Sequence, residues 1–77
     1  SEAKVKKSII TEGCMVYGNV EHSVIFAGVF IGKGTEIVDS IIMPRVKIGA
    51  NTKLHNVIIG EGAIIGDNCE IGIGEDI

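Results

Sequence analysis

Side chains that could perform acid–base or nucleophilic chemistry are few in this sequence. Its 77 residues include two histidines, His22 and His55, and two cysteines, Cys14 and Cys69. A histidine can act as general base on an acceptor group, so acyl transfer is one reaction open to these residues, although a structural or solvated role suits both histidines better. A catalytic zinc site of the three-histidine type needs one histidine more than this chain has, although several chains together could supply the three. Neither cysteine belongs to a C-x-x-C pair, and we predict no metal site.

Phosphate-binding and membrane-spanning signals are also missing. "GKG" at Gly32 and "GEG" at Gly60 are short glycine motifs, but neither precedes a helical pattern as a phosphate loop does, so we interpret them as corners. The net charge is −3 with mixed signs, which argues against a nucleic-acid surface. No apolar run has the length of a membrane span and no signal peptide is visible, so we expect a cytoplasmic protein.

The dominant feature is an internal repeat. "IGKGTEI" from Ile31, "IGANTKL" from Ile48 and "IGDNCEI" from Ile65 align at a constant step of 17 residues. The aligned positions form three columns that are aliphatic, small and aliphatic. These columns are Ile31/Ile48/Ile65, Thr35/Thr52/Cys69 and Ile37/Leu54/Ile71. A period this long that keeps residue type at each position indicates a solenoid of stacked units.

A spacing of six residues between aliphatic positions fits one short strand plus one corner. Three such units close a triangular coil, and successive coils stack about 4.8 Å apart. Fifteen Ile and eight Val suit strands and a narrow interior, and 11 Gly suit corners. A helix is excluded, because positions six apart do not stay on one helical face. The sequence therefore predicts an all-β parallel β-helix of about four coils, in which Cys14 and Cys69 lie too far apart to form a disulfide.

A second series marks one face of the predicted prism. "SII" at Ser8, "SVI" at Ser23, "SII" at Ser40 and "NVI" at Asn56 place two apolar residues side by side. In a strand with one buried face, one of the two must point outward. We therefore predict an exposed aliphatic interface. It is formed either by Ile10, Ile25, Ile42 and Ile58 or by the column beside them. In the irregular first coil, His22 aligns with the column of Ile37 and Leu54.

Longer motifs resemble one enzyme family. "SIITEGCMVYGNVEHSVIF" from Ser8 to Phe26 and "DSIIMPRVKIG" from Asp39 to Gly49 resemble the C-terminal β-helix of glucose-1-phosphate adenylyltransferases, and the resemblance runs to about Gly72. Parallel crossovers are generally right-handed, whereas this resemblance implies a left-handed, hexapeptide-repeat β-helix. It also implies that residues 8–77 are that domain, preceded by a lead-in at residues 1–7.

The resemblance further implies a role in glycogen or starch synthesis, in which ATP and glucose 1-phosphate give ADP-glucose and pyrophosphate. Catalysis and Mg²⁺ belong to a separate N-terminal domain, so this chain alone is expected to be noncatalytic and to hold no cofactor. The expected partners are that domain, other subunits, and phosphorylated sugar or nucleotide effectors. The candidate effector-binding residues are Arg45, Lys47, Lys53 and His55.

Two alternatives remain open from the residues. One is a hexapeptide-repeat acyltransferase that uses His22 or His55 as general base. The other is a purely structural β-helix module.

Overall fold

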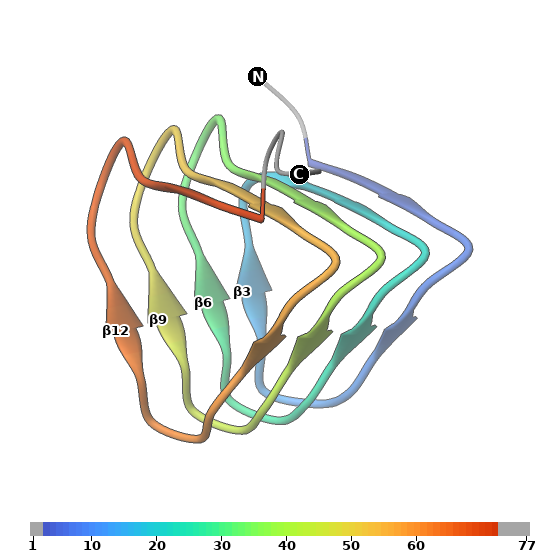
Figure 1. Cartoon of the computed structure of the whole chain (residues 1–77). Helices are drawn as coiled ribbons and strands as arrows, with labels where there is room; N and C mark the ends of the chain where they lie inside the picture. The colour runs from blue at the N-terminus through green and yellow to red at the C-terminus, as the bar shows by residue number, and fades with distance from the viewer. Residues whose placement is uncertain (1–2, 73–77) are drawn as a thin grey trace.

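The computed structural model describes residues 3–72 and contains only short strands joined by tight corners (Figure 1). Each strand has two or three residues. The strands are β1 (Lys4–Lys6), β2 (Ile9–Ile10), β3 (Met15–Val16), β4 (Asn19–Glu21), β5 (Val24–Ile25), β6 (Phe30–Ile31), β7 (Glu36–Val38), β8 (Ile41–Ile42), β9 (Lys47–Ile48), β10 (Lys53–His55), β11 (Ile58–Ile59), β12 (Ile64–Ile65) and β13 (Glu70–Ile71).

Every third strand belongs to the same parallel sheet, which is the pattern of a three-sided solenoid. Sheet A has the order β1-β4-β7-β10-β13, sheet B β11-β8-β5-β2 and sheet C β12-β9-β6-β3. Figure 1 shows the sheet C strands side by side and the coils stacked along one direction. The winding is left-handed (Figure 1), so the predicted β-helix of about four coils is confirmed. Among residues 3–72 no helix is long and apolar enough to cross a membrane.

The core is a stack of aliphatic side chains from all three sheets, and all but one of the fully buried ones are β-branched. Ile31 and Ile48 pair in sheet C, Ile37 and Leu54 pair in sheet A, and all four are fully buried. These are columns that the 17-residue step predicts. The core also contains Val20, Ile25, Val29, Ile42, Val46 and Ile59.

Hydroxyl side chains at two corners link the coils inside the prism. The Ser23 hydroxyl accepts a hydrogen bond of 3.0 Å from the backbone N–H of Ser40. In the same way the Ser40 hydroxyl accepts one of 3.2 Å from the backbone N–H of Val57. In the second column the Thr35 hydroxyl donates to the Gly49 carbonyl at 2.6 Å and accepts from the Thr52 N–H at 3.1 Å. The buried serines and threonines are therefore satisfied by the neighbouring coil.

The register of the first coil corrects two sequence predictions. Val5 pairs with Val20 and Val20 with Ile37, so the first step is 15 residues and later steps are 17. The β-helix therefore begins before residue 8, because Lys4–Lys6 already form β1 of sheet A. Val20, and not His22, occupies the column of Ile37 and Leu54. His22 lies at the next corner with a positive φ of 52°.

Of the two columns predicted for the aliphatic interface, the column of Ile10, Ile25, Ile42 and Ile58 is wrong, and the column beside it faces outward in the first three coils. Val57, and not Asn56, is the equivalent of Ser40, so the fourth segment is shifted by one residue. Because side chains alternate along a strand, this shift moves Ile58 to the opposite face from its supposed equivalents. Ile25 and Ile42 are fully buried and Ile10 is half-buried, whereas Ile58 is exposed. The outward column is Ile9, Val24, Ile41 and Ile58.

Candidate functional site

The three outer faces of the prism differ in chemistry. Face A, the outer side of sheet A, is charged; face B, the outer side of sheet B, is apolar; and face C, the outer side of sheet C, is mixed. In each strand the residues that flank the inward side chain point outward. On face A these residues are Lys4, Lys6, Asn19, Glu21, Glu36, Val38, Lys53, His55 and Glu70.

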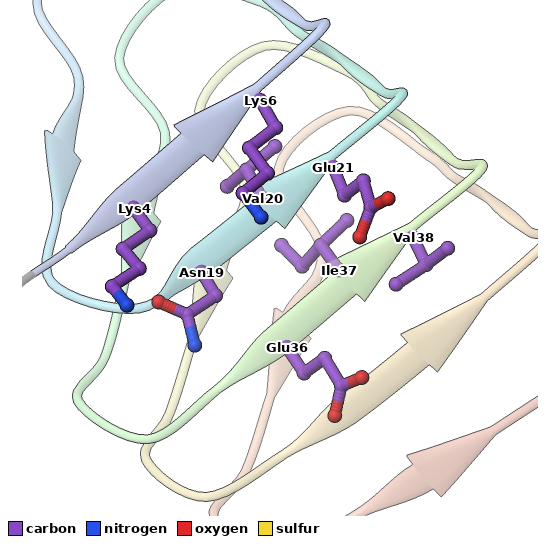
Figure 2. A pocket seen from close by; sticks show the side chains of 8 residues that line it. All are labelled: Lys4, Lys6, Asn19, Val20, Glu21, Glu36, Ile37 and Val38. Carbon is purple, nitrogen blue, oxygen red and sulfur yellow. The ribbon is translucent and has the colours of Figure 1, made fainter.

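A shallow depression lies on face A across β1, β4 and β7 (Figure 2). Lys4 and Lys6 flank it on β1, and the carboxylates of Glu21 and Glu36 stand on the following strands. The remaining lining residues are Asn19, Val20, Ile37 and Val38. Ammonium groups beside carboxylates and an amide can contact both an anionic group and hydroxyl groups of one polar ligand.

His55 adjoins this depression at the next strand. It pairs with Val38 in sheet A, and its Nε2 lies 3.6 Å from Glu36 Oε2, which is too long for a hydrogen bond. Nε2 is shielded from solvent and has no hydrogen-bond partner among the described residues. A buried polar atom without a partner is costly, but because solvent does not reach Nε2, a ligand could contact it only after a side chain such as that of Glu36 had moved.

The four residues predicted from sequence to bind an effector do not lie on one face. Lys53 and His55 are on β10 of face A. Lys47 is on β9 of sheet C, and Arg45 is in the corner before it. The Arg45 guanidinium forms an exposed ion pair with Glu61 of the next coil. The structure therefore keeps Lys53 and His55 together and separates them from Arg45 and Lys47.

Arg45 occupies an unusual backbone position. Its φ is 62°, and the equivalent corners of the other coils carry Gly13, Gly28 and Gly62, which also have positive φ. A non-glycine residue in this region costs roughly 1–2 kcal/mol. The corner accepts Arg45 because its long side chain extends outward, where it is mostly exposed.

His22, the other predicted general-base candidate, forms a corner contact. Its Nδ1 lies 2.6 Å from Asp39 Oδ1 of the next coil, and both side chains are more than half exposed. Within residues 3–72, Nε2 of His22 makes no hydrogen bond or ion pair. A carboxylate that orients a histidine is a feature of general bases, but this pair stands on an open corner.

Sequence reasoning missed the residues of the depression itself. Lys4 and Lys6 were assigned to a lead-in, and Glu21 and Glu36 were not singled out. The alternation of "KVK", "NVE" and "EIV" would have revealed them if the two-residue shortening had been placed between Val16 and Val20, where the pairings of Val16 with Ile31 and of Val20 with Ile37 put it. Cys14 and Cys69 are both free, as predicted. Among residues 3–72 no three His, Cys, Asp or Glu side chains are grouped closely enough to hold a metal ion.

The fold and its corner pattern define a class, the hexapeptide-repeat β-helices. A family model described as "GlmU-like, C-terminal hexapeptide" matches residues 1–77. The chain belongs to this family of C-terminal hexapeptide domains.

Curated relatives give a narrower resemblance. The chain is 55% identical over 73 residues to a glucose-1-phosphate adenylyltransferase of Acetivibrio thermocellus and 53% identical over 74 residues to one of Desulforamulus reducens. It is 45% identical over 65 residues to one of Bacillus cytotoxicus. The matches cover 95%, 96% and 84% of this chain but only 17%, 18% and 17% of the relatives. The predicted resemblance is confirmed, and the chain spans less than one fifth of these enzymes.

Proposed function

We propose that this chain is the noncatalytic C-terminal β-helix domain of a glucose-1-phosphate adenylyltransferase, which makes ADP-glucose and pyrophosphate from ATP and glucose 1-phosphate. The observation that carries this proposal is the 55% identity over 95% of the chain to an enzyme of that name. The parent enzyme works in the cytoplasm in glycogen or starch synthesis. Its nucleotide site and its Mg²⁺ belong to a region outside these 77 residues.

The domain's partners in the parent enzyme are its own catalytic region and the neighbouring subunits. A rigid stack suits this role, because its strands are joined by tight corners and its core side chains are fully buried. Binding surfaces on such a scaffold keep their geometry when a partner arrives.

Face A is the surface proposed for a phosphorylated effector. It carries Lys4, Lys6 and Lys53 on the outer side of one sheet, with the half-buried His55 ring beside them. Lysine binds phosphate as a point charge, and the nearby Glu21 and Glu36 can accept hydrogen bonds from sugar hydroxyls. Arg45 and Lys47 lie away from face A and are therefore not part of this proposed site.

Adenylyl transfer is the activity that tests the assignment. The purified 77-residue chain should give no ADP-glucose from ATP and glucose 1-phosphate, whereas the longer protein that contains it should. Turnover by the short chain, or none by the longer protein with Mg²⁺ present, would overturn the proposal.

Effector binding is tested separately by titration with glucose 1-phosphate and with AMP. Lys53→Ala should weaken binding several-fold, and Arg45→Ala, which removes a cation from a different surface, should not. Equal effects of the two substitutions would contradict the assignment to face A.

One observation favours an acyltransferase as a second candidate, namely the His22–Asp39 hydrogen bond. Acetyl transfer from acetyl-CoA to a sugar phosphate, lost in His22→Ala, would establish that function. The open position of this pair makes it the weaker candidate.

A further inference from the structure

Face B is a continuous apolar surface on a protein that is otherwise rich in exposed charge. Its outer residues form two columns that flank the buried isoleucines of sheet B. The first column is Ile9, Val24, Ile41 and Ile58, and the second is Thr11, Phe26, Met43 and Gly60. None of these eight residues is charged. Ile9 and Ile58 are 63% and 70% exposed, which is uncommon for side chains of this size.

Faces A and C do not share this character. Face A carries at least one lysine or glutamate on every strand from β1 to β10. Face C has Lys47 in the middle of its outward column, between Phe30 and Ile64. A charge at the centre of an interface must lose its hydration, so face B is the surface best suited to close apolar contact.

The area of face B is sufficient for a stable pair. The accessible surface of 4647 Å² is shared by three faces and two ends of the prism. An even division gives each roughly 900 Å², compared with about 800 Å² buried per partner in a typical stable interface. One face can therefore supply an interface without help from the others.

The sizes of the side chains in the two columns are complementary to each other. When two copies meet face to face about a two-fold axis parallel to the coil axis, the first column of one copy lies against the second column of its partner. At the C-terminal coil Ile58 then lies opposite Gly60 of the partner copy. At the first coil Ile9 lies opposite Thr11. The most exposed isoleucines thus meet the smallest residues of the face.

A two-fold axis along the strands gives a poorer fit. It places Ile9 against Ile58 of the partner copy, so that the two most exposed isoleucines of face B collide. Well-packed interfaces match large side chains with gaps, so the axis along the coil stack is the better solution.

We infer that face B binds face B of a second copy of this chain, with the coil axes parallel and with Ile58 lying over Gly60 of the partner copy. This inference rests on the proposed role in subunit contact and specifies the surface. Because the contact is apolar, the pair should persist at high salt, unlike binding on face A.

Sedimentation equilibrium of the 77-residue chain at high micromolar concentration should give the mass of two chains. Ile58→Lys should weaken association at least tenfold, because it puts a charge into the apolar contact. The matched control is Ile64→Lys, which changes an isoleucine of 78% exposure in the same coil but on face C, and it should leave the pair intact.

A second pair of variants tests the register. A Cβ at Gly60 meets nothing within 4 Å of its own chain, so Gly60→Leu should fold and yet block the partner's Ile58. A Cβ at Gly66, in the corner after β12, also meets nothing within 4 Å, and at the matching Gly32 and Gly49 it is directed toward the next coil, away from face B, so Gly66→Leu should leave the pair intact. Circular dichroism checks that every variant keeps its β spectrum.

Several results would overturn the inference. They are a monomeric unmodified chain, larger assemblies that survive Ile58→Lys, dissociation by the control variants instead of the face B variants, and a pair that tolerates Gly60→Leu. Because association is measured without substrate, adenylyl transfer by the longer protein can succeed or fail independently.

Discussion

Ile48 is the residue at which the account of the core can be tested most quantitatively. Its side chain is fully buried on β9 between Ile31 and Ile65 of the adjacent coils. Ile48→Ala removes three carbons at about 0.8 kcal/mol each and leaves a cavity in a narrow prism, which gives a loss of about 3–5 kcal/mol. A chain of this length has a free energy of unfolding of roughly 4–12 kcal/mol, so about a quarter of the stability or more would be lost.

Urea denaturation followed by circular dichroism measures this loss at one fixed protein concentration, because association also affects stability. The matched control is Lys47→Ala, the preceding residue of β9, whose side chain is exposed on face C. It should change the free energy of unfolding by less than about 0.5 kcal/mol. Ile48→Asp should prevent folding altogether, because the prism offers the carboxylate no partner. A loss below about 1 kcal/mol for Ile48→Ala, or equal losses at the two positions, would refute the inward placement.

Three further predictions concern the corners. Gly32→Ala should lower the free energy of unfolding by at least about 2 kcal/mol, because a Cβ there lies 2.7 Å from the Gly49 backbone. Gly66→Ala should leave the free energy of unfolding nearly unchanged in the same urea assay. Thr35→Val should cost about 1–3 kcal/mol, since it leaves the buried Thr52 N–H without an acceptor, and faster amide exchange at Thr52 would report this directly. Arg45→Gly should change the free energy of unfolding by less than about 1 kcal/mol, because glycine removes the cost of the positive φ and this offsets the loss of the exposed ion pair with Glu61. A larger loss would show that the ion pair stabilises the corner.

The regular part of the chain was predictable because its step is constant. Ile31/Ile48/Ile65 and Thr35/Thr52 keep one residue type per position over coils of equal length, so alignment alone identifies the core. The first coil was not predictable in the same way. It is two residues shorter, and the sequence does not show that the shortening falls between Val16 and Val20, as the pairings of Val16 with Ile31 and of Val20 with Ile37 do.

The surface was harder to predict than the core. Asn56 resembles the serines of its series in polarity, yet Val57 holds their position, and this one-residue error reversed the direction assigned to Ile58. The candidate effector residues were chosen by closeness in sequence, whereas a β-helix corner separates Lys47 from Lys53 onto different faces. Direction and face depend on where corners fall, which residue type alone does not determine.

The central claim is that this chain serves as the C-terminal domain of a glucose-1-phosphate adenylyltransferase, and a chimera tests it most directly. The chain would replace the matching 73-residue segment of the Acetivibrio thermocellus enzyme, to which it is 55% identical. We predict that kcat/KM for ATP and glucose 1-phosphate stays within about tenfold of the unmodified enzyme, and that the Ile48→Asp chimera is inactive. A chimera that is soluble and contains the folded β-helix but makes no ADP-glucose would contradict the account.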